Sequence, residues 1–171
     1  ANAGRATGPL KRVRDDAAPT GRASLSEDGR FLLFPKYEFD SGGLWLRELQ
    51  TGHERQLVAT PRTPLNPVMS VDGRWGAYTV TAVETGGNSG PGQGFVNETS
   101  GGVPQKVCES CEVAMWTRNT QIVVSEAEGK TLTRIEPRSG TRVPLLSSSQ
   151  GPMDRPMFGP WGAWVTFNIP E

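Results

Sequence analysis

The 171-residue sequence carries 18 basic and 18 acidic side chains, and its formal net charge of zero argues against a protein that binds nucleic acid through a basic surface. It contains no run of about 18 apolar residues, so neither a membrane-spanning helix nor insertion into a membrane is expected. The 21 Gly and 14 Pro residues lie between short apolar runs, which predicts many short strands joined by turns rather than a disordered chain.

Residues 1–22 are rich in Gly, Ala, Arg and Pro, and only residues 10–13 (Leu-Lys-Arg-Val) alternate as a strand would. We interpret residues 1–22 as a linker or an N-terminal strand segment whose later part pairs with the edge of a sheet. Apolar residues in the rest of the chain come in runs or alternate, and helical spacing is never sustained. The sequence therefore predicts an all-β protein.

From residue 23 onward the sequence repeats one pattern. In the first copy, residues 26–34 (Ser-Glu-Asp-Gly-Arg-Phe-Leu-Leu-Phe) predict an Asp-Gly turn between two short strands. A longer loop over residues 35–43 follows, and then an alternating strand over residues 44–49 and a fourth strand over residues 53–58. Four strands in this order predict one antiparallel sheet.

Three further copies follow. Residues 70–78 (Ser-Val-Asp-Gly-Arg-Trp-Gly-Ala-Tyr) keep the Ser, Asp, Gly and Arg of the first copy and lead to a Gly-rich loop over residues 86–94. Residues 117–124 keep a polar turn before a β-branched run, and residues 158–164 keep the Trp-Gly-Ala-aromatic ending. We align the copies on the residue that opens each apolar run, and these anchors are Phe31, Trp75, Gln121 and Trp161.

The anchors lie 44, 46 and 40 residues apart, and a period of this size indicates a repeat architecture. Each repeat is one predicted four-stranded blade, except that the last is partial. The blades are predicted over about residues 23–58, 66–107, 112–146 and 153–171.

This repeated pattern resembles the TolB-like, WD-repeat-like β-propeller unit. The resemblance rests on Ser-Glu-Asp-Gly-Arg-Phe-Leu-Leu-Phe, then Leu-Trp-Leu-Arg-Glu-Leu, then Thr-Gly and Arg-Gln-Leu-Val, and it covers about residues 23–169. The Pro of the family turn is Glu27 and Val71 here, and the last two copies lack the Asp-Gly pair. The resemblance implies a β-propeller of four-stranded antiparallel blades, about three and a half to four of them.

A set of three and a half blades fits either a small ring or an arc of a larger propeller, and we favour the arc. An arc exposes blade faces that are rich in apolar side chains. It therefore predicts self-association through open blade edges, or further sequence that covers them.

Cys108 and Cys111 are the first candidates for chemistry. A Cys-x-x-Cys pair can close as a disulfide, bind a metal or act as a redox centre. A metal would need two further ligands, while the only His, His53, lies in another repeat, and no strand-helix context of a thioredoxin is present. We favour a structural disulfide or a reduced loop pair, and we expect no metal and no cofactor. A disulfide would indicate an oxidising compartment.

A serine protease site is not expected. Residues 87–91 (Gly-Asn-Ser-Gly-Pro) resemble the nucleophile segment of trypsin-like proteases only superficially, although His53, Asp72 and Ser89 follow in that order. Asp72 belongs to a repeated turn, whereas a catalytic triad needs a buried Asp that orients the His. The sequence contains no Gly-x-Ser-x-Gly elbow, phosphate loop or dinucleotide motif, so no catalytic residue is predicted.

The propeller resemblance places function on the face that carries the loops between second and third strands and between consecutive blades, where propellers commonly bind ligands. Exposed aromatic residues beside mixed charges suit recognition of a protein or peptide. The candidate binding residues come from three of these loops, and they are Tyr37, Phe39, Asp40, Arg62, Asp154 and Arg155.

We therefore expect a non-catalytic β-propeller module for protein or ligand interaction, part of a larger bacterial protein located in the periplasm or outside the cell. The alternative is a propeller segment that gates or supports a hydrolase or peptidase whose catalytic domain is not in this chain.

Overall fold

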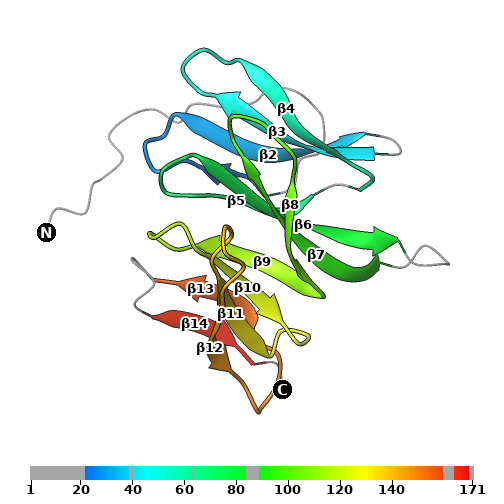
Figure 1. Cartoon of the computed structure of the whole chain (residues 1–171), viewed down its shortest axis with the longest axis vertical. Helices are drawn as coiled ribbons and strands as arrows, with labels where there is room; N and C mark the ends of the chain where they lie inside the picture. Colours follow the sequence, from blue (N-terminus) through cyan, green and yellow to red (C-terminus); the bar gives the residue numbers. More distant parts are fainter. Residues whose placement is uncertain (1–21, 39–40, 63, 84–88, 160–163, 170–171) are drawn as a thin grey trace, which may run out of the picture.

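The structure is a computed structural model, and it describes residues 22–38, 41–62, 64–83, 89–159 and 164–169. Within these ranges the chain forms strands and turns and no helix, so none of the described residues belongs to a helix that could cross a membrane. The described residues form fourteen strands in four antiparallel sheets that follow one another along the chain (Figure 1).

Each of the first three sheets, named blades 1 to 3, holds four consecutive strands in sequence order. Blade 1 consists of β1 (Ser24–Leu25), β2 (Phe31–Glu38), β3 (Ser41–Glu48) and β4 (Glu54–Thr60). Blade 2 consists of β5 (Leu65–Met69), β6 (Trp75–Val83), β7 (Ser89–Glu98) and β8 (Gln105–Glu109). Blade 3 consists of β9 (Cys111–Trp116), β10 (Ile122–Glu126), β11 (Thr131–Ile135) and β12 (Arg142–Ser147). Blade 4 has two strands in the described part of the chain, β13 (Asp154–Phe158) and β14 (Val165–Asn168).

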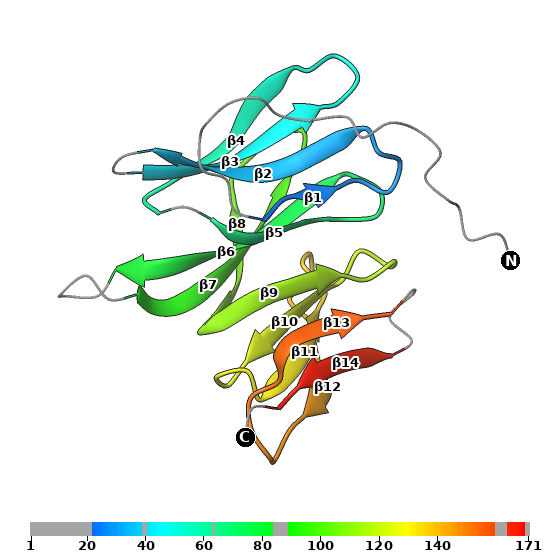
Figure 2. The same ribbon diagram turned by 180° about the vertical axis from the view of Figure 1, so that it is seen from behind.

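The blades stack face to face along an arc, as both views show (Figures 1 and 2). The first strands of neighbouring blades lie side by side, since β5 contacts both β1 and β9. These first strands form what we call the inner wall. The arrangement is a β-propeller arc of three complete blades and part of a fourth, and the predicted fold class is confirmed.

Three apolar clusters hold the blades together, one at each interface. Leu33, Leu44 and Tyr78 belong to the cluster between blades 1 and 2. The cluster between blades 2 and 3 is the largest, and the cluster between blades 3 and 4 is built around Val123 and Leu132. Because blades 2 and 3 each have a neighbour on both faces, their strands read as apolar runs rather than as a strict alternation.

Hydrogen bonds between blades add to this packing. The backbone N–H of Met69 donates to Ser24 Oγ at 2.9 Å, and the backbone N–H of Val113 donates to Thr79 Oγ1 at 2.9 Å. Trp116 Nε1 also reaches back to the carbonyl oxygen of Val68, at 3.1 Å. Each of these bonds ties a first strand to the preceding blade.

The repeated Ser-x-Asp-Gly turn has the same geometry in blades 1 and 2. In blade 1, Ser26 N–H donates to the carbonyl oxygen of Phe31 at 2.9 Å, and Ser26 Oγ accepts a hydrogen bond from Phe31 N–H at 2.9 Å. Gly29 supplies the positive φ of 69° that the turn requires. Local turn chemistry therefore sets the spacing of the first two strands in each blade.

The degraded copies differ from the sequence alignment in one place. In blade 3 the corresponding bond runs from Thr117 N–H to the carbonyl oxygen of Gln121, so this turn is one residue shorter. In blade 4 it runs from Gly159 N–H to the carbonyl oxygen of Trp164 at 3.0 Å. The predicted anchor Trp161 lies outside the described residues, and this bond makes Trp164, 43 residues after Gln121, the counterpart of Phe31.

Two predicted loops are mostly strand. Over residues 35–43, β2 and β3 continue as a hairpin, and over residues 86–94, β7 begins at Ser89. The glycines of β7 serve close packing rather than a loop, because a Cβ on Gly92 would lie 2.5 Å from the carbonyl oxygen of Cys111. The N-terminal segment predicted over residues 1–22 lies outside the described residues except for Arg22.

Large apolar side chains are exposed at the end of the arc that blades 3 and 4 form. Val143 and Leu145 are exposed on β12, and Met157 and Trp164 are exposed on blade 4. At the other end, Lys36 lies 4.0 Å from the Trp45 ring centroid and covers part of the apolar surface.

Candidate functional site

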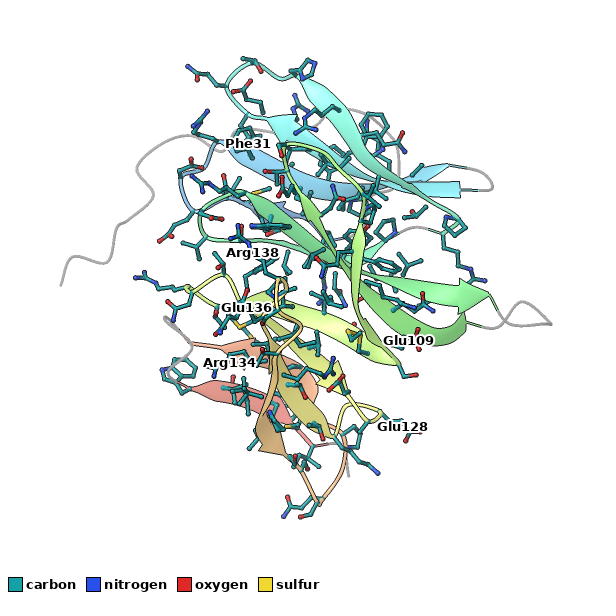
Figure 3. The ribbon with its side chains drawn as sticks, viewed as in Figure 1. Phe31, Glu109, Glu128, Arg134, Glu136 and Arg138 are labelled. Carbon is teal, nitrogen blue, oxygen red and sulfur yellow. A yellow bond between two sulfur atoms is a disulfide. The ribbon has the colours of Figure 1, made fainter. Side chains whose placement is uncertain are left out.

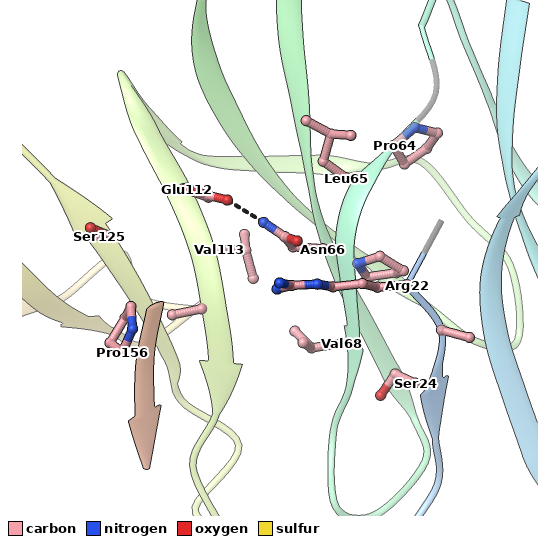
Figure 4. A pocket seen from close by; sticks show the side chains of 13 residues that line it. Arg22, Ser24, Pro64, Leu65, Asn66, Val68, Glu112, Val113, Ser125 and Pro156 are labelled. Carbon is pink, nitrogen blue, oxygen red and sulfur yellow. Dashed lines mark hydrogen bonds between the residues drawn. The ribbon is translucent and has the colours of Figure 1, made fainter. Parts of the chain in front are cut away.

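A cavity of about 580 Å³ opens in the inner wall, and residues from the first strands of all four blades line it. The side chains that matter most for chemistry are Arg22, Asn66, Glu112 and Ser125 (Figure 4). Leu65 and Val68 supply apolar surface beside them. We call this the inner-wall cavity.

Irregular pairing shapes this wall, because three first strands each carry one residue more than the strand with which they pair. The register shifts between Leu65 and Val68 in β5, within β9 opposite Val123 and Val124, and between Asp154 and Met157 in β13. Such bulges bend a strand and redirect side chains, and they are common near functional sites. The backbone itself therefore turns polar side chains into the cavity.

Asn66 shows the effect of the bulge most clearly. Its φ is 47°, a left-handed conformation that Asn tolerates better than most residues. In this conformation Asn66 Nδ2 donates a hydrogen bond to Glu112 Oε1 of β9, which joins blades 2 and 3 across the cavity (Figure 4). Arg22 reaches from the blade 1 side toward the same strand, so both charge signs are present in one cavity.

A second hollow of about 720 Å³, named here the outer groove, continues from the cavity between blades 2 and 3. The two share Leu65, Glu112 and Ser125. The groove runs past the link between β8 and β9 to the β10–β11 turn at Glu128. Figure 3 shows Glu109 and Glu128 on the opposite side of the arc from Glu136 and Arg138.

Cys111, which forms a disulfide with Cys108, lines the outer groove. Cys108 is the next-to-last residue of β8 and Cys111 is the first residue of β9, with the positive-φ residue Ser110 (φ 49°) between these strands. Both cysteines are buried in the cluster between blades 2 and 3. The structure therefore uses this pair to fasten one blade to the next.

The structure describes the predicted binding residues only in part. Tyr37 lies in β2, and Asp154 and Arg155 lie in β13 rather than in loops, but their side chains, together with Phe39 and Asp40, lie outside the described part. Arg62 is half-buried, and its carbonyl oxygen accepts a 2.6 Å hydrogen bond from Thr60 Oγ1. The role of these six residues in binding stays a prediction.

Sequence reasoning missed the residues that line the inner wall. Asn66 and Glu112 are ordinary strand-end residues in the sequence, and the only local signal is the Asn66-Pro67 step, which suggests an irregular strand start. Asp72 does not orient His53, because its carboxylate accepts hydrogen bonds from Ser70 and from the Arg74 backbone.

No metal centre is found among the residues that the structure describes, where no three His, Cys, Asp or Glu side chains are grouped to hold an ion. The buried phenol of Tyr78 stacks on Phe95 with ring centroids 5.8 Å apart, and burial raises the pKa of this phenol. Tyr78 therefore acts as a packing residue.

No protein-family model and no curated protein sequence matches this chain. Solved structures do match. Putative TolB from Agrobacterium tumefaciens is 19% identical with a TM-score of 0.68, over 92% of this chain and 56% of that one. Oligogalacturonate lyase in complex with manganese is 12% identical with a TM-score of 0.70, over 88% and 47%.

The β-propeller domain of the trilobed protease from Pyrococcus furiosus, described as having an open velcro topology, is 12% identical with a TM-score of 0.61, over 77% of this chain and 43% of that one. The chain thus spans about half the length of each of these three structures. At these identities the comparisons show a TolB-like β-propeller fold.

Proposed function

We propose that this TolB-like propeller segment is a non-catalytic interaction module that binds an extended protein segment or peptide along the inner-wall cavity and the outer groove. The observation that carries the proposal is the Asn66–Glu112 hydrogen bond, which places a carboxylate where the two hollows meet. Proteins of the same fold act as binding scaffolds and as enzyme domains, so the fold alone does not assign a function to this chain.

The shape of the site favours an elongated ligand. The cavity and the groove are each large enough for a compact small molecule, whose pockets measure about 300–1,000 Å³. Because they share three lining residues, they form one continuous path from the inner wall to the outer face. An extended peptide can follow such a path, with Leu65 offering apolar contact along it.

The chemistry of the site favours a ligand of mixed character. Arg22 and Glu112 provide one charge of each sign, and Asn66 and Ser125 add hydrogen-bonding groups. Peptide backbones and side chains use all of these, whereas a nucleic acid would require a surplus of cations. We therefore propose a protein or peptide partner.

We further propose that the module works outside the cytoplasm of a bacterium, in the periplasm or extracellular space. The Cys108–Cys111 disulfide supports this location, because disulfides persist in oxidising compartments and are rare in the cytosol.

The test is a selection of peptides that bind the wild-type chain from a displayed random library. For the selected peptides we expect Glu112→Gln to raise the Kd by about tenfold, the loss that removal of one charge-assisted hydrogen bond produces. Glu136→Gln, on the opposite side of the arc (Figure 3), is the matched control and should leave the Kd unchanged. The proposed site would be refuted if Glu112→Gln left the Kd unchanged and Glu136→Gln raised it.

A second candidate function is a propeller segment that gates or supports a hydrolase or peptidase. The observation that favours it is the structural likeness to the propeller domain of the trilobed protease. The reading frame that encodes this chain distinguishes the two, because a downstream Gly-x-Ser-x-Gly with a later Asp and His would favour the enzyme.

A further inference from the structure

The connection between blades 2 and 3 is very short, and a covalent bond closes it. A single residue, Ser110, separates β8 from β9, and the Cys108–Cys111 disulfide spans it with the Cα atoms 6.1 Å apart. Only 6% of Cys108 and 4% of Cys111 is exposed. The bond therefore acts at the seam between two blades and not on a surface loop.

The surroundings of the two sulfur atoms are tight. A Cβ placed on Gly94 of β7 would lie 2.6 Å from Cys108 Sγ, 3.1 Å from Cys111 Sγ and 3.4 Å from Val113 Cγ2. After reduction the two sulfur atoms are no longer bonded. They must then separate to van der Waals distance, well beyond the roughly 2.05 Å of a disulfide bond. Because the β7 backbone blocks inward movement, the extra distance has to come from movement of the strand ends.

Strand pairing holds the chain on both sides of the disulfide. Cys108 of β8 is paired with Gly94 of β7, and Cys111, the first residue of β9, is paired with Glu126 of β10. Along β9, Val113 is the residue whose backbone N–H bonds back to blade 2, at Thr79 Oγ1. Residues 109–112 therefore form the part of the chain between the blades that has to shift when the sulfur atoms separate, together with the end of β10 that pairs with Cys111 and Glu112.

Three of these residues, Ser110, Cys111 and Glu112, line the outer groove. We propose that the Cys108–Cys111 disulfide is a redox lock on this groove wall. Oxidised, it holds Glu112 against Asn66; reduced, it releases residues 109–112 while the blades stay folded. The inference concerns the conformation of the wall and does not depend on which ligand the groove binds.

The reaction is a thiol–disulfide exchange with a dithiol reductant. A thiolate of the reductant attacks one sulfur of the pair through the groove, the other cysteine leaves as a thiolate, and a mixed disulfide forms. The second thiol of the reductant then displaces the first cysteine. Two electrons and two protons pass to the protein, which carries two thiols, and the reductant becomes a disulfide.

The fold is expected to survive reduction. A disulfide that closes so short a loop restricts the unfolded chain less than one that closes a long loop. The apolar cluster between blades 2 and 3 contains seven buried residues besides the two cysteines, and the bond from Trp116 to Val68 does not involve the sulfur atoms. Opening is thus confined to the seam.

Hydrogen exchange of the whole chain, read by mass spectrometry with and without dithiothreitol, tests the proposal. We expect amides of residues 109–112 to exchange at least about tenfold faster after reduction, which corresponds to about 1.4 kcal/mol of local opening free energy. Amides of residues 122–124 of β10, which pair with β9 beyond Glu112, should not change. The Cys108→Ser/Cys111→Ser variant is the control, since dithiothreitol should have no effect on it.

Three outcomes would overturn the proposal. Equal exchange of residues 109–112 in the oxidised and reduced wild type would show that the wall does not depend on the disulfide. Loss of protection throughout the chain on reduction would show a structural staple rather than a lock. Two free thiols in the unreduced protein, measured by thiol titration under denaturing conditions, would show that the lock is never closed.

Discussion

Ser70 Oγ donates a hydrogen bond of 2.6 Å to Asp72 Oδ1 and accepts one of 3.0 Å from the backbone N–H of Trp75. Blade 1 repeats this relationship, with Ser26 Oγ 2.6 Å from Asp28 Oδ1. One hydroxyl thus links the Asp side chain to the first residue of the second strand. The Asp in this motif is a structural residue of the turn.

Replacing Asp72 with Ala should lower the free energy of unfolding by about 1 kcal/mol, because the Ser70 hydroxyl and the Arg74 N–H each lose an acceptor. Urea denaturation measures the loss, and Val71→Ala, a change of the exposed neighbour in the same turn, is the control. Peptide affinity of the folded protein should not change. A stable Asp72→Ala protein that no longer binds its selected peptides would instead assign Asp72 to the binding site.

Stability should also depend on the charge of these turns. The Ser26 hydroxyl and a backbone N–H lower the pKa of Asp28 below its ordinary 3.8. At Asp72 desolvation acts in the opposite direction, but hydrogen bonds from Ser70 and a backbone N–H outweigh it and the pKa is lowered. The folded state therefore favours the ionised forms, and their contribution is complete above pH 3.8 and disappears as the pH falls through the lowered values.

Urea unfolding measured between about pH 2 and pH 6 tests this dependence. The free energy of unfolding of the wild type should fall more steeply below pH 3.8 than that of an Asp28→Asn/Asp72→Asn variant. Parallel curves for the two proteins would mean that the turns do not shift the titration of either carboxylate.

The shortened turn of blade 3 offers the opposite case, a position that can be improved. Thr120 has a φ of 58°, close to the 68° of Gly73 in the intact turn, although a β-branched residue is strained there. Thr120→Gly should raise the free energy of unfolding by about 0.5–1 kcal/mol. This is the backbone strain that Gly relieves minus the cost of the greater conformational freedom of Gly in the unfolded chain. Thr120→Ala also removes the hydroxyl but keeps the strain, so it should not stabilise. Equal effects of the two substitutions in thermal unfolding would contradict this account.

The fold could be predicted because its signals are local. The Asp-Gly turn at Asp72 and Gly73 depends only on residues within the turn and the first residue of the next strand, and the same residues recur in blade 1. Where the turn chemistry is lost, the prediction weakens. In blade 4 the spacing of Trp and Gly pointed to Trp161, whereas the backbone hydrogen bond identifies Trp164 as the anchor.

The inner wall could not be predicted in the same way. Asn66 and Glu112 lie 46 residues apart, and their contact depends on how blade 3 packs against blade 2. The strand bulge that redirects Asn66 has no strong sequence signature beyond Pro67. Likewise, Gly92 and Gly94 suggested a loop, because the sequence does not show that the next blade approaches their backbone closely.

Gly94 gives the sharpest test of that close approach. Gly94→Ala should lower the free energy of unfolding by about 1–3 kcal/mol, because the new Cβ meets two sulfur atoms that their bond prevents from moving apart. Gly76→Ala is the matched control within blade 2, where the new Cβ lies 3.0 Å from Leu33 Cδ2, the end of a side chain that can rotate, so a smaller loss is expected.

Repeating Gly94→Ala in the Cys108→Ser/Cys111→Ser background by urea denaturation isolates the coupling between Gly94 and the disulfide. The loss of unfolding free energy should shrink in that background because the two side chains can separate. An undiminished loss in that background would mean that Gly94 is required by the strands around it and not by the disulfide.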